Sequence, residues 1–169
     1  MRISSKSLAL GFASVVLAVG GLATPAAAGG PQAATVAADG TVVAVDGSEV
    51  GQVTIHKRGD GTEPPASLGN PSEWGVVEIE MDASADSVKP MSEVCKNVGG
   101  GQWCYGWYWS AGDGKYCYSN YYHNTKTHAS SVEIGGGDDS SGWVRAGRTA
   151  NANRTAGLAY TCKTYYSIK

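Results

Sequence analysis

The chain has 169 residues, a formal net charge of −2, and a composition that includes 24 glycines, nine tyrosines, five tryptophans and one phenylalanine. This length provides one ordinary domain, or a small domain with an extension. Frequent glycine together with Trp, Tyr, Thr and Val favours short strands and turns over helices. The charge is too small to indicate nucleic-acid binding, so we expect no nucleic acid partner.

The first 28 residues have the organisation of a secretory signal peptide. Arg2 and Lys6 form a short basic region, residues 8–22 are mostly apolar, and the alanines at 26–28 suit a signal peptidase, which makes Gly29 the expected first mature residue. A membrane anchor is the alternative. The apolar stretch is too short and too rich in Gly and Ala for one, and no later segment can span a bilayer. The sequence predicts a secreted protein with no stable membrane span.

Residues 29–90 form an acidic extension. Residues 29–91 contain ten acidic and three basic residues, whereas residues 92–169 contain five acidic and eight basic residues. Residues 82–90 have the composition of a linker. The strands expected in the extension are short and lie at 41–45, 51–55 and 76–79. The extension is either a propeptide or a β-unit packed on the rest of the chain.

The C-terminal part, residues 91–169, contains a dense group of aromatic residues. Nine of the twenty residues from 103 to 122 are Trp or Tyr, and rings at this density favour strands. The expected strands lie at 103–109, 116–122, 129–134 and 159–168, the first two as a hairpin. The predicted fold class is all-β, a small antiparallel β-sandwich stabilised by disulfides. A small domain cannot bury nine such rings, so some are expected at an interface.

The same part contains all four cysteines, Cys95, Cys104, Cys117 and Cys162. An even number in a secreted chain predicts two disulfides, with three connectivities to choose from. A hairpin that pairs Cys104 with Cys117 also places Trp103 opposite Tyr118, and it leaves Cys95 to bond Cys162. This is the connectivity that we expect. The spacing does not match a zinc site, and we expect no metal and no other cofactor.

A set of motifs in residues 95–169 combines glycine, aromatic and histidine residues. The most specific is Ser-Asn-Tyr-Tyr-His at 119–123, followed by Lys126 and His128. The others are Gly-Gly-Gly-Gln-Trp at 99–103, Tyr105 with Gly106, Ser130, Val132, Gly-Trp-Val-Arg-Ala-Gly at 142–147, Ala-Asn-Ala at 150–152 and the aromatic segment 160–166. In these motifs and in its signal peptide, the chain resembles the lactococcin 972 family of secreted bacteriocins.

The resemblance implies a small secreted β-sandwich that self-associates, for example as a homodimer. It also implies an antibacterial protein that forms no pores, binds the cell-wall precursor lipid II or another cell-envelope component of Gram-positive bacteria, and blocks septum and wall synthesis. The chain departs from the type member of the family in its four cysteines and its acidic extension. The expected organisation is a signal peptide at 1–28, an acidic extension with a linker at 29–90, and a lactococcin 972-like domain at 91–169.

Lipid II offers a pyrophosphate, two amino sugars and a peptide, so its recognition needs cations and flat rings. The candidates for the phosphate contacts are Lys126, Arg145 and Arg148 together with His123 and His128, since Arg makes bidentate phosphate contacts. Glycine loops at 99–101 and 135–137 bring backbone N–H groups near an anion. The candidates for stacking on sugar rings are Trp107, Trp109, Tyr121 and Tyr122. The histidines have an alternative role as structural hydrogen-bonding residues.

An enzyme is not expected. The sequence contains no Gly-x-Ser-x-Gly, His-Glu-x-x-His or phosphate-loop motif, and it predicts no catalytic residue. The adjacent Asp138 and Asp139 fit a solvated turn better than the carboxylate pair of a glycan hydrolase. The second hypothesis is a non-toxic secreted β-sandwich that binds cell-surface glycan or serves in adhesion.

Overall fold

The computed structural model describes residues 34–44, 47–79, 93–110, 112 and 114–169. The predicted signal peptide, its cleavage site and the linker at 82–90 lie outside these residues. Within the described ranges, no helix is long and apolar enough to cross a membrane.

The described residues form strands and one short 3₁₀ turn. The strands are β1 (Thr35–Val36), β2 (Thr41–Val43), β3 (Glu49–Lys57), β4 (Glu73–Ile79), β5 (Val94–Val98), β6 (Gly101–Ser110), β7 (Gly114–Tyr122), β8 (His128–Ile134), β9 (Gly137–Ser140), β10 (Thr149–Ala156) and β11 (Cys162–Ile168). The 3₁₀ turn is η1 (Ala66–Leu68).

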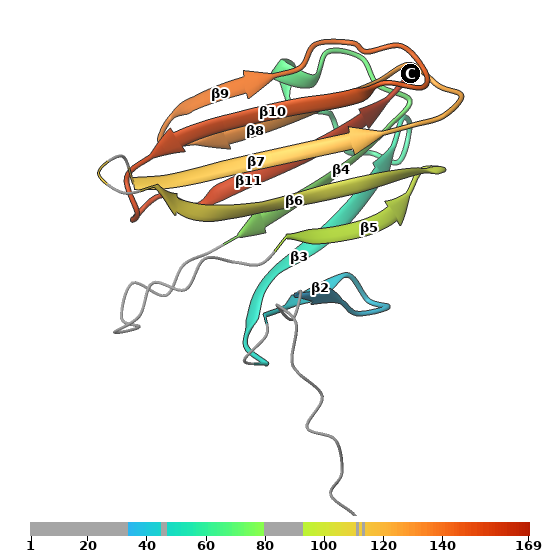
Figure 1. The fold of residues 1–169 in the computed structure, drawn as a ribbon. Helices are drawn as coiled ribbons and strands as arrows, with labels where there is room; N and C mark the ends of the chain where they lie inside the picture. The colour runs from blue at the N-terminus through green and yellow to red at the C-terminus, as the bar shows by residue number, and fades with distance from the viewer. Residues whose placement is uncertain (1–33, 45–46, 80–92, 111, 113) are drawn as a thin grey trace, which may run out of the picture.

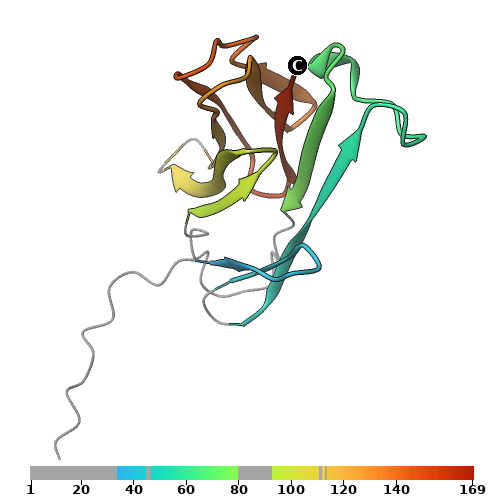
Figure 2. The same cartoon turned by 90° about the vertical axis from the view of Figure 1, so that its right-hand side faces the viewer.

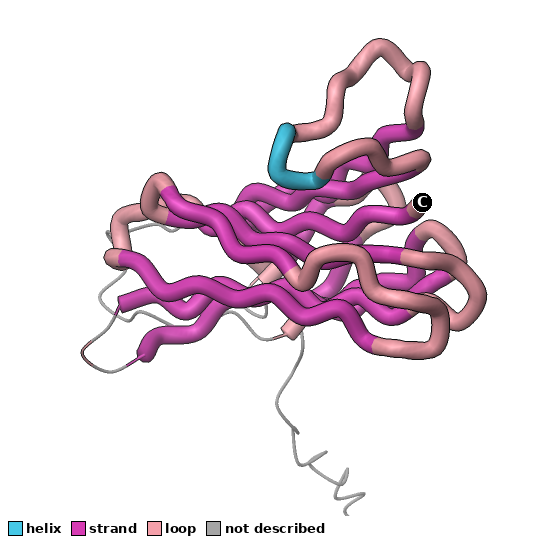
Figure 3. Tube along the Cα trace, turned by 90° about the horizontal axis from the view of Figure 1, so that it is seen from above, coloured by secondary structure: helices cyan, strands magenta, loops and turns pink. Residues whose placement is uncertain are grey.

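The strands build two antiparallel sheets that pack face to face. One has the order β1-β2-β3-β4-β11-β8-β9, and the other has the order β10-β7-β6-β5. Figure 1 shows the four-stranded sheet in front of the larger one, and the turned views in Figures 2 and 3 show the two layers. The predicted all-β antiparallel sandwich is confirmed.

Large rings fill the space between the sheets. Trp103, Tyr105, Tyr121 and Tyr166 are fully buried. The ring centroid of Trp103 lies 4.4 Å from that of Tyr105 and 5.1 Å from that of Tyr166, and the centroids of Tyr121 and Tyr166 are 4.8 Å apart. These tilted contacts join β6 and β7 of one sheet to β11 of the other, which is the geometry that aromatic pairs prefer.

A buried polar network also joins the two sheets. The indole Nε1–H of Trp103 donates a hydrogen bond to Ser119 Oγ over 2.9 Å, and the hydroxyl of Ser130 donates to the same oxygen over 2.7 Å. The hydroxyl of Ser119 in turn donates to the carbonyl oxygen of Tyr165 over 2.9 Å. Because all these groups find partners, the core carries its polar atoms without a desolvation penalty at this point.

The acidic extension contributes strands to the larger sheet. β4 pairs with β3 on one side and with β11 on the other, from Cys162↔Ile79 to Ile168↔Glu73. At the pair Tyr166↔Gly75, a Cβ atom on Gly75 would collide with the ring of Tyr166. A glycine is needed there for that buried ring to cross β4. The extension therefore completes a sheet instead of packing on it as a separate unit.

The expected register of the aromatic hairpin is wrong. β6 and β7 pair Gly106 with Tyr118 and Trp103 with Tyr121, and they close at Ser110↔Gly114. The turn lies further along the chain than the Cys104–Cys117 pairing requires. Cys117 faces the core and is fully buried, whereas Cys104 lies on the outer face of the sheet. Two cysteines on opposite faces of a hairpin cannot bond.

The disulfides accordingly differ from the expected connectivity. Cys95 bonds Cys104, its direct partner in the β5–β6 hairpin, and Cys117 on β7 bonds Cys162 on β11. The first bond links neighbouring strands in one sheet, with Cα atoms 4.1 Å apart. The second crosses the core and ties the two sheets together.

We predict that the two disulfides contribute unequally to stability. The Cys117–Cys162 bond spans 45 residues and the Cys95–Cys104 bond spans nine. On loop-closure entropy, replacing the first pair with alanine lowers the free energy of unfolding by about 4 kcal/mol, and replacing the second lowers it by about 3 kcal/mol. Urea unfolding of the two double variants measures this order. A larger loss for the Cys95→Ala/Cys104→Ala variant would contradict it.

One lysine is fully buried. Lys115 lies at the start of β7, where its Nζ donates a hydrogen bond to the carbonyl oxygen of Tyr160 and sits 5.3 Å from the ring centroid of Trp107. Burial lowers the pKa of Lys115 to about 8 from 10.5. The protonated amine is therefore disfavoured in the folded protein relative to the unfolded chain.

This lysine predicts a pH dependence of stability. Between pH 8 and about pH 10 the unfolded chain binds more protons than the folded protein, so the free energy of unfolding rises with pH. A pKa lowered from 10.5 to about 8 corresponds to a rise of up to about 3 kcal/mol, which the contacts with the Tyr160 carbonyl and the Trp107 ring reduce. Denaturation at several pH values, compared with Lys115→Met, measures this rise. An equal slope in the variant would show that Lys115 is not its source.

Candidate functional site

The basic loops that the sequence singles out meet at one end of the sandwich. Lys126, Arg145 and Arg148 are all exposed, the first on the loop after β7 and the other two on the segment before β10. Figure 1 shows both connections at the same end as the C-terminus. The C-terminal Lys169 joins them, since its backbone N–H donates to the carbonyl of Thr127 over 3.0 Å. We call these four cations the basic end.

The cations of the basic end are free of acidic partners. None of the four forms an ion pair with another described residue. The ammonium of Lys169 lies 4.5 Å from the ring centroid of Trp143, which fixes it over the segment that carries Arg145 and Arg148. Exposed positive charges that lack internal partners attract an anionic ligand.

Two buried histidines hold these loops in place. His128 is fully buried, and its ring nitrogens face the carbonyl oxygens of Lys126 at 2.8 Å and Arg148 at 2.9 Å. Both contacts are hydrogen bonds only when both nitrogens carry hydrogen. One ring therefore connects the backbones of the two cationic loops.

His123 ties the first of these loops to the glycine turn at 99–100. Its Nδ1 accepts hydrogen bonds from the backbone N–H groups of Thr125 and Lys126, at 3.1 and 3.0 Å. The ring hydrogen is therefore on Nε2, which donates to the carbonyl oxygen of Gly99 over 3.0 Å. The rings of His123 and His128 lie 6.1 Å apart beside Tyr121. The structure places both histidines inside, where they position the loops that carry the cations.

An open hollow of about 450 Å³ lies beside the basic end. It is lined by residues 97–102, Tyr122 and Asn124. Gly99 and Gly100 have φ values of 60° and 85°, a left-handed conformation that glycine adopts without strain. The hydroxyl of Tyr122 donates to Asn124 Oδ1 over 3.4 Å. The lining is mostly apolar surface from Val98, the glycines and the Tyr122 ring, with a few amide groups and no charged side chain.

The four aromatic candidates do not share one location. Tyr122 is 40% exposed at the hollow, and Trp109 is 54% exposed near the other end of the hairpin. Trp107 and Tyr121 face the core and are buried. Of the four, the structure brings only Tyr122 to the basic end. The glycines at 135–137 are also apart from it, since Gly135 and Gly136 connect β8 to β9 and Gly137 begins β9.

Sequence reasoning missed three tyrosines on the outer face of the β6–β7 hairpin. Tyr108, Tyr116 and Tyr118 alternate with core residues, so a correct register would have identified them from the two-residue period of a strand. The incorrect register obscured this pattern.

No metal site is found among the described residues. One group combines residue types that bind metals within reach of one another, Glu93 with Cys95 and Cys104. Both sulfur atoms belong to a disulfide, and they are therefore not thiolate ligands.

The comparisons with known proteins give a family match for the C-terminal part of the chain. Residues 99–166 match the family model described as Bacteriocin (Lactococcin_972). The match begins at the glycine turn, includes both histidines and the basic loops, and ends in β11. Residues 99–166 are thus similar to the lactococcin 972 bacteriocin family, and the resemblance noted from the motifs is confirmed. No curated protein and no solved structure matches the chain.

We predict that His123, and not His128, protects the backbone amides of Thr125 and Lys126. Replacing His123 with alanine removes the acceptor of the Thr125 and Lys126 N–H groups, so both amides exchange faster with solvent. Replacing His128 with alanine leaves that acceptor in place, although it separates the two loops. Each variant is expected to lose about 1–3 kcal/mol of stability, the cost of leaving buried polar groups unpaired.

Hydrogen exchange followed by NMR tests this assignment, with Arg154→Gln as the control at a position outside these loops. Unchanged exchange of the Thr125 and Lys126 amides in His123→Ala would contradict it.

Proposed function

We propose that this protein is a secreted bacteriocin that binds lipid II through its basic end and blocks wall and septum synthesis without forming pores. The match of residues 99–166 to a bacteriocin family supports a bacteriocin-like antibacterial protein. The target, the mode of binding and export with cleavage near Ala28 are the parts that we add.

The observation that carries the proposal is the convergence of Lys126, Arg145, Arg148 and Lys169 at one end of the sandwich. A pyrophosphate carries its negative charge on oxygens that accept hydrogen bonds, and guanidinium groups bind such oxygens in pairs. Arg145 and Arg148 lie on one short segment. The histidine contacts hold the backbone of that segment and of the Lys126 loop, so part of the ordering cost of binding is met in the free protein.

The neighbouring hollow suits the uncharged part of such a ligand. Its lining by Asn97, Gln102, Asn124 and Tyr122 offers amide donors and acceptors together with an aromatic ring. A lipid-linked disaccharide presents sugar hydroxyl and acetamido groups directly beside its phosphates. The hollow and the basic end lie beside each other in the same way.

Binding alone accounts for the inhibition, and the proposal needs no catalysis. Sequestering a precursor removes the substrate from the enzymes that polymerise it. The acidic pair Asp138 and Asp139 lies on β9, where the carboxylate of Asp139 accepts the backbone N–H of Asn153 over 2.8 Å. That carboxylate stabilises the edge between β9 and β10.

We predict that removing two cations weakens binding to lipid II. The Arg145→Ala/Arg148→Ala variant is expected to bind vesicles containing lipid II about tenfold or more weakly than the unaltered protein, since charge-assisted hydrogen bonds are lost. The control Arg154→Gln removes one exposed positive charge on β10 and is expected to leave affinity unchanged. Higher salt weakens binding of the unaltered protein.

Vesicles with undecaprenyl phosphate and soluble glycan serve as ligand controls in this assay. Equal affinity of the double-arginine variant and the unaltered protein would remove the basic end from the site. Failure of the unaltered protein to bind lipid II, or to stop septation in sensitive Gram-positive cells, would contradict the proposed function and favour a non-toxic binding module.

A further inference from the structure

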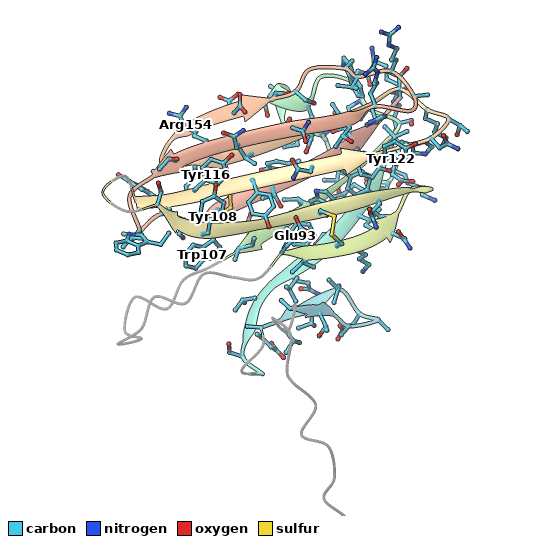
Figure 4. All side chains as sticks on the ribbon, viewed as in Figure 1. Glu93, Trp107, Tyr108, Tyr116, Tyr122 and Arg154 are labelled. Atoms are coloured by element: carbon cyan, nitrogen blue, oxygen red, sulfur yellow. A yellow bond between two sulfur atoms is a disulfide. The ribbon has the colours of Figure 1, made fainter. Side chains whose placement is uncertain are left out.

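The outer face of the four-stranded sheet presents rings and amides in a regular arrangement. Tyr108 on β6, Tyr116, Tyr118 and Asn120 on β7, and Asn151 and Asn153 on β10 all point away from the core. We call these six residues the tyrosine face. Figure 4 shows Tyr108 and Tyr116 together on the viewer's side of the sheet, with Tyr122 further along β7.

The three rings form one contiguous patch. Tyr108 and Tyr116 are direct cross-strand partners with stacked rings, 4.5 Å between centroids and 27° between planes. The ring of Tyr118 lies 6.2 Å from Tyr108 and 6.4 Å from Tyr116. The ring of Tyr118 also lies over Gly106. A Cβ atom added to Gly106 would lie 2.9 Å from the hydroxyl oxygen of Tyr118. The missing side chain at 106 lets this ring lie along the sheet.

A row of amides runs beside the rings. Asn151 is the cross-strand partner of Asn120, and Asn153 is the partner of Tyr118. The amide of Asn151 donates to the carbonyl of Thr149 over 3.3 Å, and the amide side chains of Asn120 and Asn153 have no partner among the described residues. Each amide offers both a donor and an acceptor, as a sugar hydroxyl does.

The face is uncharged. No outward position of β6, β7 or β10 carries an acidic or basic side chain in the described part of the chain. Burial raises the pKa of both Tyr118 and Tyr116. Glu93 adds to the rise at Tyr118, and Tyr108 followed by Asp139 adds to the rise at Tyr116, so these two carboxylates lie at the margins of the face. This electrostatic environment disfavours phosphates and differs from the basic end.

We propose that the tyrosine face binds an uncharged polysaccharide chain, at a site separate from the basic end. Stacked rings match the flat faces of sugars, and the amide row matches their hydroxyl and acetamido groups. A protein partner fits less well, because the outward positions of these strands hold no Val, Ile, Leu or Met, and the centre of a protein interface is apolar. This site needs neither the lipid nor the pyrophosphate of the proposed function, and it would hold the protein on wall glycan.

The test uses the mature protein with both disulfides intact and two neutral polysaccharides, chitin with its soluble tetrasaccharide and cellulose with its soluble tetrasaccharide. Retention on at least one polymer and saturable binding of its tetrasaccharide are expected, and the pair shows whether acetamido groups are recognised. Tyr108 is 45% exposed, so Tyr108→Ala is compatible with folding. It is expected to weaken tetrasaccharide binding about tenfold, whereas Tyr108→Phe retains the ring and the binding.

Two controls separate this site from the proposed function. Tyr160→Ala removes a ring that is 54% exposed but lies outside the face, and it is expected to bind as the unaltered protein does. Arg145→Ala/Arg148→Ala is expected to keep glycan binding whether or not lipid II binding fails. The inference is overturned if the unaltered protein binds neither polysaccharide, or if Tyr108→Ala binds glycan normally. It is also overturned if the double-arginine variant loses glycan binding while Tyr108→Ala keeps it.

Discussion

The register of the β6–β7 hairpin is the constraint on which the rest of the structure depends. Pairing Gly106 with Tyr118 sends Trp103 and Tyr121 into the core and turns Tyr118 outward across the glycine. It also places Cys117 inside, opposite β11, so that a disulfide can join the two sheets. A shift of one residue would exchange the two faces, and it would expose the core rings while burying polar amides. One pairing choice thus produces both a packed interior and an aromatic outer surface.

The same register separates two kinds of chemistry. The end of the hairpin at His123 leads into the loops that carry the cations, where buried imidazoles bind backbone groups and leave Lys126 and Arg148 free in solvent. The flat part of the hairpin is uncharged and presents Tyr108 beside Tyr116. A lipid-linked wall precursor joins phosphates to sugars, and the polymerised glycan has lost the lipid and its pyrophosphate. In our proposal, a cationic site and a neutral site on adjoining surfaces allow one small protein to engage both.

Much of the fold could be predicted from the sequence, since aromatic density and glycine turns locate most strands. The segments 116–122 and 129–134 closely match β7 and β8, and Lys126, Arg145 and Arg148 are exposed as expected. The register could not be derived, because strand periodicity does not determine the position of a turn. The roles of the histidines depend on loops that meet only in the folded chain. β9 and β10 were missed, since Gly, Asp, Asn and Ala have low strand propensity and form strands here through pairing with their neighbours.

The most direct test of the central claim is an NMR titration of the isotope-labelled protein with lipid II in micelles, with empty micelles as the reference. The account predicts that the largest changes in amide chemical shift occur at residues 99–102, 122–127 and 143–148, which form the hollow and the basic end. Changes confined to β1 and β2, or to the turn at Gly135 and Gly136, would contradict it. β1, β2 and this turn lie at the opposite end of the sandwich, whereas Glu73 of β4 pairs with Ile168 beside the basic end.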